Sequence, residues 1–259
     1  MREIKSFLLA ILAMVAAVPF LVACEKEDVE NIKQEPQITL TTNLEVGDPI
    51  VLRFNRDKMP TKVIGAEKIY KTTVDMDGGH FESWFVDITY KITSQTIVLK
   101  GDIPALRCWN NELTGLDVSR CPGLSLLQCD YNQLTTLNVS NNPKLEYLSC
   151  DDNQLTQLDV SKNPEMEILS CANNKLTSIN VRNSSWLYHI DCHNNKIKAA
   201  EMSKIIKLLR DWTYELIWSY YGYPVNSATM TAVSNTDSEE NEISEADIKI
   251  AQDKNWKFE

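Results

Sequence analysis

The stretch Leu145-Glu146-Tyr147-Leu148-Ser149-Cys150-Asp151-Asp152-Asn153-Gln154-Leu155 decides the fold, because variants of it recur every 21 residues. Each variant has leucine or isoleucine two residues before a cysteine and asparagine three residues after it. The cysteines are Cys108, Cys129, Cys150, Cys171 and Cys192, and the asparagines are Asn111, Asn132, Asn153, Asn174 and Asn195. A fixed period of roughly 20–50 residues is typical of stacked repeats. The sequence therefore predicts a solenoid over residues 105–197.

Each repeat is expected to have two short extended sides. Apolar residues alternate around Leu148 and Cys150, which predicts a strand with these two side chains inward and Tyr147, Ser149 and Asp151 outward. A second alternation follows in each repeat, at Leu116-Asp117-Val118, Leu137-Asn138-Val139, Leu158-Asp159-Val160 and Ile179-Asn180-Val181. A single turn of this kind cannot bury its own leucines, so the repeats must stack.

Two ladders of polar side chains are expected at the turns. The amide of a residue such as Asn153 can both donate and accept hydrogen bonds, so a stack of asparagines can satisfy turn backbone that is cut off from water. A second ladder of the same kind is predicted at Cys121, Asn142, Asn163 and Ser184. Pro122, Pro143 and Pro164 follow it and are expected to end the second extended side.

The pattern LxxLxCxxNxL over residues 105–197 resembles the leucine-rich repeat family, with cysteine in place of the last core leucine. The second half of each repeat is most similar to the short repeats of bacterial surface leucine-rich-repeat proteins. The resemblance implies an α/β-type repeat solenoid that is mostly β with few helices and has a parallel sheet on one face. It also implies a binding scaffold.

The cysteines are expected to be reduced structural thiols. Five of the seven point inward, and stacked neighbours would lie about 4.8 Å apart at the backbone. That distance permits a disulfide, but parallel Cβ vectors on one face favour packing. No C-x₂-C spacing suggests zinc.

Residues 1–23 have the composition of an export signal. Arg2 and Lys5 precede an apolar run that is interrupted by Pro19 and is too short for a comfortable membrane span. The end of the run, Leu21-Val22-Ala23-Cys24, resembles a bacterial lipobox, which implies acylation of Cys24. The alternative is an ordinary signal peptide with an incidental cysteine. Residues 24–36 are expected to form a polar tether, since acidic residues with one lysine follow Cys24. That start resembles a signal for the outer face of a Gram-negative outer membrane.

Both ends of the solenoid must be capped, because an open end exposes core leucines and a sheet edge. Residues 37–104 alternate as short strands and are expected to form an all-β N-terminal cap, or alternatively a binding domain of their own. Residues 96–101 alternate in the manner of a repeat and are expected to begin a first, degenerate turn of the solenoid. The lone His80 is not expected to be a ligand.

The repeat fails after Asn195, and residues 198–259 are expected to form a helical C-terminal cap. Ala199 to Leu209 has helical spacing. Ser244 is placed to cap a second helix that Asn255 can end in a left-handed conformation, before a short last strand at residues 256–258. The aromatic stretch 212–223 is expected to pack this cap, with a ligand platform as the alternative.

The outward positions of the first extended side are the candidate ligand surface. Leu126, Tyr147 and Ile168 are expected to form an exposed apolar strip, which would mark a contact site. The candidate ligand-binding residues are Trp109, Asp130, Tyr147, Asp151, His189, Asp191 and His193. A shared metal ion is not expected, because His189 and His193 would lie about 13 Å apart on a straight strand.

We therefore expect a non-catalytic, lipid-anchored surface protein that needs no cofactor and recognises a protein or glycan. The alternatives are a periplasm-facing structural or envelope-assembly lipoprotein, and an enzyme with its site in residues 37–104 or in the aromatic tail. No nucleophile elbow, phosphate loop, HExxH or EF-hand pattern occurs. The net charge of −10 without any basic run argues against nucleic acid.

Overall fold

The computed structural model describes residues 35–73, 85–212, 217–218, 224–225, 228–232 and 240–258. The signal segment, the tether up to residue 34, Cys24, His80 and most of the aromatic stretch lie outside these residues. Within them, no helix is long and apolar enough to cross a membrane.

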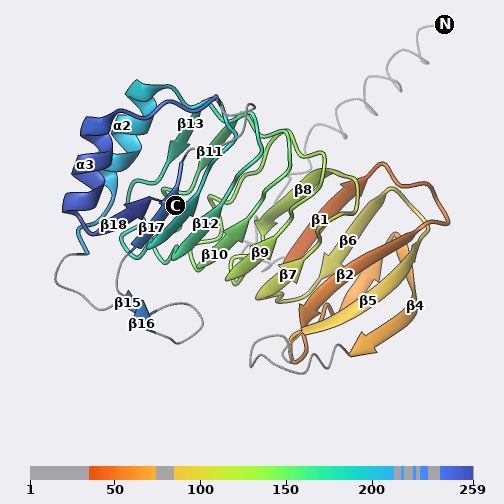
Figure 1. Ribbon diagram of the computed structural model, residues 1–259. Helices are drawn as coiled ribbons and strands as arrows, with labels where there is room; N and C mark the ends of the chain where they lie inside the picture. Colours follow the sequence, from red (N-terminus) through yellow and green to blue (C-terminus); the bar gives the residue numbers. More distant parts are fainter. Residues whose placement is uncertain are drawn as a thin grey trace, which may run out of the picture. The chain divides into compact units, whose positions relative to one another are not determined.

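A parallel sheet forms the first extended side of the repeats, as predicted (Figure 1). Its strands in the repeat region are β7 (Ala105–Arg107), β9 (Leu126–Gln128), β10 (Tyr147–Ser149), β12 (Ile168–Ser170) and β14 (His189–Asp191). They pair in a constant register in which each residue lies beside the residue 21 positions later, for example Leu127 beside Leu148. On the opposite side of the turns, β11 (Gln157–Asp159) pairs in parallel with β13 (Ser178–Asn180).

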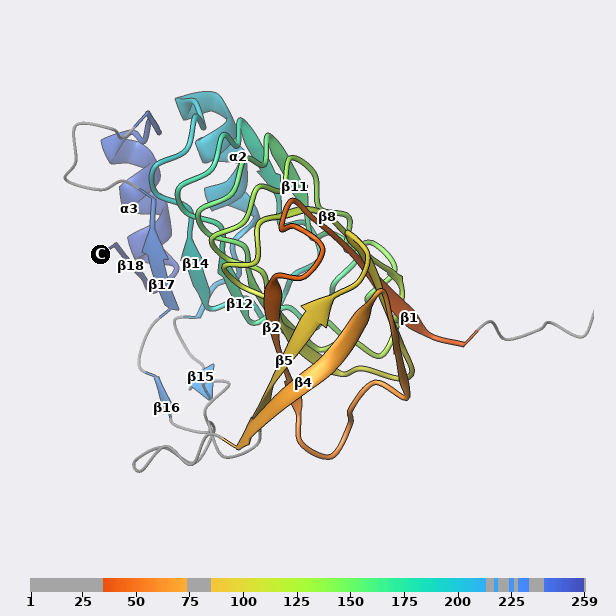
Figure 2. The same ribbon diagram turned by 90° about the vertical axis from the view of Figure 1, so that its right-hand side faces the viewer.

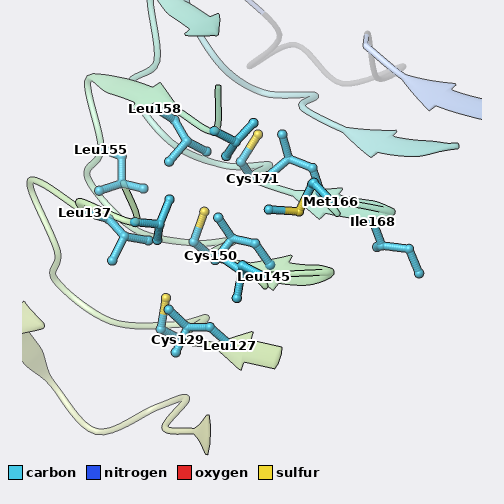
Figure 3. Close-up of a cluster of buried hydrophobic side chains, with 14 of the residues drawn as sticks. Leu127, Cys129, Leu137, Leu145, Cys150, Leu155, Leu158, Met166, Ile168 and Cys171 are labelled. Atoms are coloured by element: carbon cyan, nitrogen blue, oxygen red, sulfur yellow. The ribbon is translucent and has the colours of Figure 1, made fainter. Parts of the chain in front are cut away.

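The interior is a stack of leucines and cysteines. The five cysteines of the repeat and Cys121 are buried, as expected, and they form no disulfide among the residues that the structure describes. Figure 3 shows the sulfurs of Cys129, Cys150 and Cys171 one above another. The Cys150 thiol donates to the carbonyl of Ser170 in the next turn, at 3.5 Å. Burial raises the pKa of this thiol well above its ordinary value, so the cysteines act as small apolar residues with a weak donor.

The asparagine ladder is confirmed in atomic detail. The amide oxygen of Asn153 accepts from the backbone N–H of Leu134 in the preceding turn at 3.0 Å. Its amide nitrogen donates to the carbonyls of Cys129, Cys150 and Asp151. The residue before each ladder asparagine has a left-handed backbone; these residues are Asn110, Tyr131, Asp152, Asn173 and Asn194. Asparagine and aspartate tolerate that conformation best, which explains four of the five.

The second ladder is also present. Asn142 and Asn163 are fully buried, and the amide of Asn163 donates to the carbonyls of Val139 at 2.9 Å and Asn142 at 2.7 Å. At the two ends of this ladder, Cys121 donates to the carbonyl of Ile103 and Ser184 donates to that of Val160. These contacts tie successive turns together at the corner opposite the first ladder.

In its described residues the N-terminal cap is all-β, as predicted, and it shares both of its sheets with the solenoid (Figure 2). Its strands are β1 (Gln37–Thr42), β2 (Pro49–Asn55), β3 (Lys62–Ile64), β4 (Ala66–Thr73), β5 (Phe85–Ile92) and β6 (Thr96–Lys100). Three cap strands extend the large sheet beyond β7. Strand β2 pairs with β7, β5 pairs with β2, and β4 pairs with β5, all antiparallel. The other sheet has the order β3-β6-β1-β8, in which β8 (Leu113–Arg120) belongs to the first repeat.

The expectation that residues 96–101 begin a first turn of the solenoid is wrong. Strand β6 runs antiparallel between β1 and β3 and therefore belongs to the cap. Its alternating residues Ile97 and Leu99 are fully buried. The same alternation occurs in any half-buried strand, so spacing alone could not separate an antiparallel cap strand from a solenoid turn.

The C-terminal cap contains the two expected helices, α2 (Ala199–Leu208) and α3 (Glu245–Asp253). Helix α2 buries Met202, Ile205 and Ile206. The Ser244 side chain accepts from the backbone N–H of Asp247 at 3.1 Å, and Asn255 has the expected left-handed backbone with φ of 63°. Both predictions from capping chemistry are confirmed. The antiparallel pair β15 (Ile217–Trp218) and β16 (Pro224–Val225) lies between the helices in sequence.

The sequence repeat fails after Asn195, as predicted, but the solenoid sheet continues past it, which corrects the expectation that the solenoid ends at residue 197. Strand β17 (Ala228–Thr231) pairs in parallel with β14, and β18 (Trp256–Phe258) pairs with β17. Asn241 supplies a further ladder residue, since its amide donates to Cys192 and Ala232 carbonyls, both at 2.7 Å, and accepts from Ile197. The 21-residue spacing is lost because α2 and its connections are inserted into this turn.

Candidate functional site

The candidate ligand-binding residues lie on one surface, the side of the large sheet that faces away from the cysteines. We call it the outward face. Strand register arranges it in three rows. The first row is Ala105, Leu126, Tyr147, Ile168, His189 and Thr229. The second is Arg53, Arg107, Gln128, Ser149, Ser170, Asp191 and Thr231. The third, just beyond the strands, is Trp109, Asp130, Asp151, Ala172 and His193.

Carboxylates and serines on neighbouring strands form a hydrogen-bonded chain across the outward face. Ser149 donates its hydroxyl to Asp130, and the same carboxylate oxygen accepts from the backbone N–H of Asp151 at 2.9 Å. One turn later, Ser170 donates to Asp151 at 2.7 Å, and the Ala172 N–H donates to it at 2.7 Å. Each aspartate is thus held in place by the turn that follows it.

Burial of these carboxylates raises their pKa. Desolvation is the largest cause at Asp130, partly offset by the hydrogen bond from Ser149. At Asp151, desolvation and the nearby Asp130 charge raise the pKa to about 6, against the lowering effect of Ser170. Because the carboxylates remain part-buried and like-charged, a cationic group that reaches them would gain more than it would at an ordinary surface carboxylate.

His189 and His193 have different hydrogen-bond partners and do not point to a common site. His193 places Nδ1 at 2.6 Å from Asp191, whereas Nδ1 of His189 lies 2.6 Å from the Thr229 hydroxyl of β17. The Asp191 carboxylate fixes the orientation of the His193 ring. No group of three or more metal-ligating side chains is close enough to hold an ion among the residues that the structure describes.

The exposed apolar strip was predicted wrongly. Leu126 is only 2% exposed and Ile168 only 8%, and Tyr147 is half-buried. Figure 3 shows Ile168 directed away from the stacked sulfurs, so it does lie on the outward face. Leu126 packs with Phe85 and Ala105, and Tyr147 packs against this cluster. The sequence could not show this, because Phe85 comes from the cap and has no place in the repeat.

Ser149 was also expected to be exposed but is buried, because it lies between two turns and bonds to Asp130. Tyr147 is anchored from the other side, since Gln128 donates to its hydroxyl at 3.3 Å. Of the predicted residues, the aspartate pair, Tyr147 and the Asp191–His193 pair therefore lie on a fixed surface. Part of the hydrogen-bonding capacity of these side chains is already used by contacts within the chain.

Trp109 belongs to an arginine–aromatic joint between cap and solenoid. Arg53 of β2 forms a two-bond ion pair with Asp87 of β5, and its guanidinium lies 5.0 Å from the centroid of the Trp109 ring. Arg107 of β7 lies 3.9 Å from the centroid of the Phe85 ring. Trp109 keeps 36% of its surface exposed. Sequence reasoning missed the partners from the cap, because only the fold brings these strands beside β7.

Glu146 and Glu167 form a further pair that sequence reasoning missed. They precede β10 and β12 by one residue, and the backbone N–H of Glu167 donates to the Glu146 carbonyl at 2.8 Å. Burial and the neighbouring Glu146 charge raise the pKa of Glu167 to about 7. The 21-residue spacing between Glu146 and Glu167 could have predicted this pair, since it places the two carboxylates at equivalent positions of adjacent turns.

No protein-family model matches this chain, and no curated protein matches it. Among solved structures, the chain is similar to one described as "Functional domain of InlJ from Listeria monocytogenes includes a cysteine ladder". The sequences are 32% identical, the TM-score is 0.43, and the match covers 58% of this chain. It covers 33% of the other chain, so this chain spans about a third of that length. The described strands and ladders themselves make this protein a leucine-rich-repeat-like solenoid, mostly β with few helices.

Proposed function

We propose that this protein is a non-catalytic, lipid-anchored cell-surface protein whose outward face binds a protein or glycan partner. The observation that carries the proposal is the row of carboxylates Asp130 and Asp151, held by serines and backbone N–H groups. Such a row is rigid before a partner arrives, so little ordering is needed on binding. Stacked repeats present extended surfaces of this kind, and the fold is consistent with protein binding.

The anchoring part of the proposal rests on the sequence around Cys24 alone. Acyl chains on this cysteine would hold the protein on a membrane, since each buried CH₂ contributes about 0.8 kcal/mol. The acidic residues that follow Cys24 support placement on the outer face of a Gram-negative outer membrane. Protease treatment of intact cells tests this placement. Cleavage of the solenoid without lysis is expected, whereas protection until the outer membrane is opened would favour a partner in the periplasm.

The binding surface is tested by the double variant Asp130→Asn/Asp151→Asn. Asparagine keeps an oxygen that accepts from the serines, so the fold should survive, while both negative charges are lost. We expect binding to weaken at least about tenfold, the effect of about 1.4 kcal/mol, with thermal unfolding at neutral pH unchanged or slightly improved. Arrays of extracellular proteins and of glycans provide the ligands, and binding is compared between wild type and variant.

The matched control is Asp57→Asn/Glu245→Gln, which removes the same charge at exposed positions in the cap and in α3. It should leave every interaction found on the arrays intact. If the control weakens binding as much as the double variant does, overall charge explains the result. If neither changes it, the binding surface lies elsewhere.

A further inference from the structure

A groove lies on the other side of the solenoid, between the back strands β11 and β13 and helix α2. Figure 1 shows α2 beside β13. The groove has a volume of about 510 Å³, which is within the range of about 300–1,000 Å³ that is usual for ligand pockets. Its lining comes from β11, from β13 and the nearby Arg182, and from one face of α2.

The floor of the groove is apolar. Leu158 and Ile179 contribute from the back strands, and Ile205 contributes from α2. Leu208, at the last position of α2, is 44% exposed. A buried floor with an exposed leucine at its margin can receive one apolar side chain and remove it from water, which is favourable by roughly 25 cal/mol per Å² buried.

The charged side chains that line the groove are Arg182, Lys204 and Lys207 against Asp159 and Glu201, a net charge of +1. Lys204 is paired with Glu201 of the same helix at 2.6 Å. Arg182 and Lys207 also line the groove, and within the described residues their side chains form no ion pair. The chain as a whole has a net charge of −10. The net charge of the lining is therefore opposite in sign to that of the chain and of the carboxylate row on the outward face, and Arg182 and Lys207 are the cations left for a partner.

Polar groups suited to a peptide backbone lie between the charges and the floor. The side chains of Gln157 and Ser178 line the groove on adjacent turns. In the described part of the chain, neither side chain makes a hydrogen bond, so both can donate to or accept from a bound segment. An amide and a hydroxyl of this kind each offer a donor and an acceptor.

We propose that this groove binds an extended, acidic segment of a partner protein that carries at least one apolar side chain. The apolar side chain occupies the floor formed by Leu158, Ile179 and Ile205. Flanking carboxylates approach Arg182 and Lys207. This surface is independent of the outward face, so the molecule has two binding faces of opposite charge.

The test uses a fluorescein-labelled peptide of alternating glutamate and leucine, titrated with the mature protein and followed by fluorescence anisotropy. We expect saturable binding that weakens with added salt, since exposed charges are screened over about 8–10 Å at ordinary ionic strength. The double variant Arg182→Glu/Lys207→Glu should weaken it at least about tenfold. Leu208→Ser should weaken it at low and high salt alike, because it removes apolar rather than electrostatic contact.

The control is Lys58→Glu/Lys144→Glu, which makes the same change of charge at exposed positions away from the groove. It should shift the affinity less than about twofold. Equal weakening by both double variants, or an unaltered affinity in Arg182→Glu/Lys207→Glu, overturns the proposal. So does stronger binding of an oligo-dT strand or of anionic vesicles at the same groove. The Asp130→Asn/Asp151→Asn variant should bind the peptide normally, which separates this proposal from that for the outward face.

Discussion

Single polar side chains carry much of the architecture. A turn such as the one at Asn153 leaves several backbone groups without water, and one amide satisfies four of them. The asparagine is buried at 7% exposure, so bulk water does not compete with these hydrogen bonds in the folded chain. This explains why a polar residue recurs in an otherwise apolar interior.

Asn153→Ala should therefore be costly. We expect a loss of about 2–4 kcal/mol in the free energy of unfolding, because buried backbone groups lose their partners. Urea denaturation followed by circular dichroism measures it. Asn141→Ala is the control, since Asn141 is exposed and makes a single 3.3 Å bond to Ser119. A loss of similar size in both variants would show that the ladder has no special role.

The pH dependence of stability follows from the acidic pairs. The pKa of Glu167 is raised to about 7 and that of Asp151 to about 6 in the folded chain, against 4.5 and 3.8 ordinarily. Between the ordinary pKa and the raised pKa of each group, the folded state therefore holds more protons than the unfolded state. By linkage, this contribution to stability is largest at low pH and is lost as pH rises through 6 to 7.

Thermal unfolding should accordingly occur at a lower temperature at pH 8 than at pH 5. Glu167→Gln/Asp151→Asn should flatten the profile, chiefly by raising the unfolding temperature at pH 8. Differential scanning calorimetry across this range provides the measurement. A wild-type profile that is already flat, or a variant with an unaltered slope, would assign the effect to other groups.

At the scale of elements, the repeat pattern predicted both ladders and the inward cysteines, and the resemblance to leucine-rich repeats implied the parallel sheet. The pattern shows which positions are equivalent in successive repeats, and these features depend only on contacts between equivalent positions. Strand β17 and Asn241 were not predictable in this way, because α2 and its connections separate Asn241 from Asn195. The burial of Leu126 was equally hidden, since Phe85 reaches it from a different part of the chain.

Asn241→Ala should loosen the C-terminal end without unfolding the rest. The variant loses bonds to Cys192, Ala232 and Ile197, and we expect amide hydrogen exchange to accelerate in β17 and α2 by an amount equivalent to about 2 kcal/mol. Protection at β9 and β10 should stay as in wild type. Gln252→Ala, at an exposed position of α3, is the control. Uniform loss of protection along the chain would argue that the end is not a separate unit.

At the scale of the whole described unit, cap and solenoid are joined by continuous sheet. The ladder ends on the cap, because the Asn111 amide donates to the Val51 carbonyl at 2.9 Å and accepts from the Val51 N–H. The candidate site was only partly predictable for the same reason. Its aspartates follow the repeat, but Arg53 and Asp87 reach it from the cap.

Arg53→Met tests this joint. The variant keeps an unbranched apolar stem but leaves Asp87 unpaired, with 19% of its side chain exposed, and removes the contact with Trp109. We expect a loss of about 1–3 kcal/mol in unfolding free energy and faster hydrogen exchange in β2 and β7. Arg56→Met, at an exposed neighbouring position, should have little effect. Equal behaviour of the two variants would mean that the ion pair does not hold the joint.

The asparagine of each turn satisfies the backbone of the turn before it, and this has a consequence for how the gene can change. Every repeat presents the same backbone groups to the next turn and needs the same hydrogen bonds from its asparagine. An in-frame duplication or deletion of one repeat therefore leaves both caps with the neighbours they require. Such events would lengthen or shorten the binding surface by about 4.8 Å at a time, so reach can vary between related genes while the chemistry of each turn stays fixed.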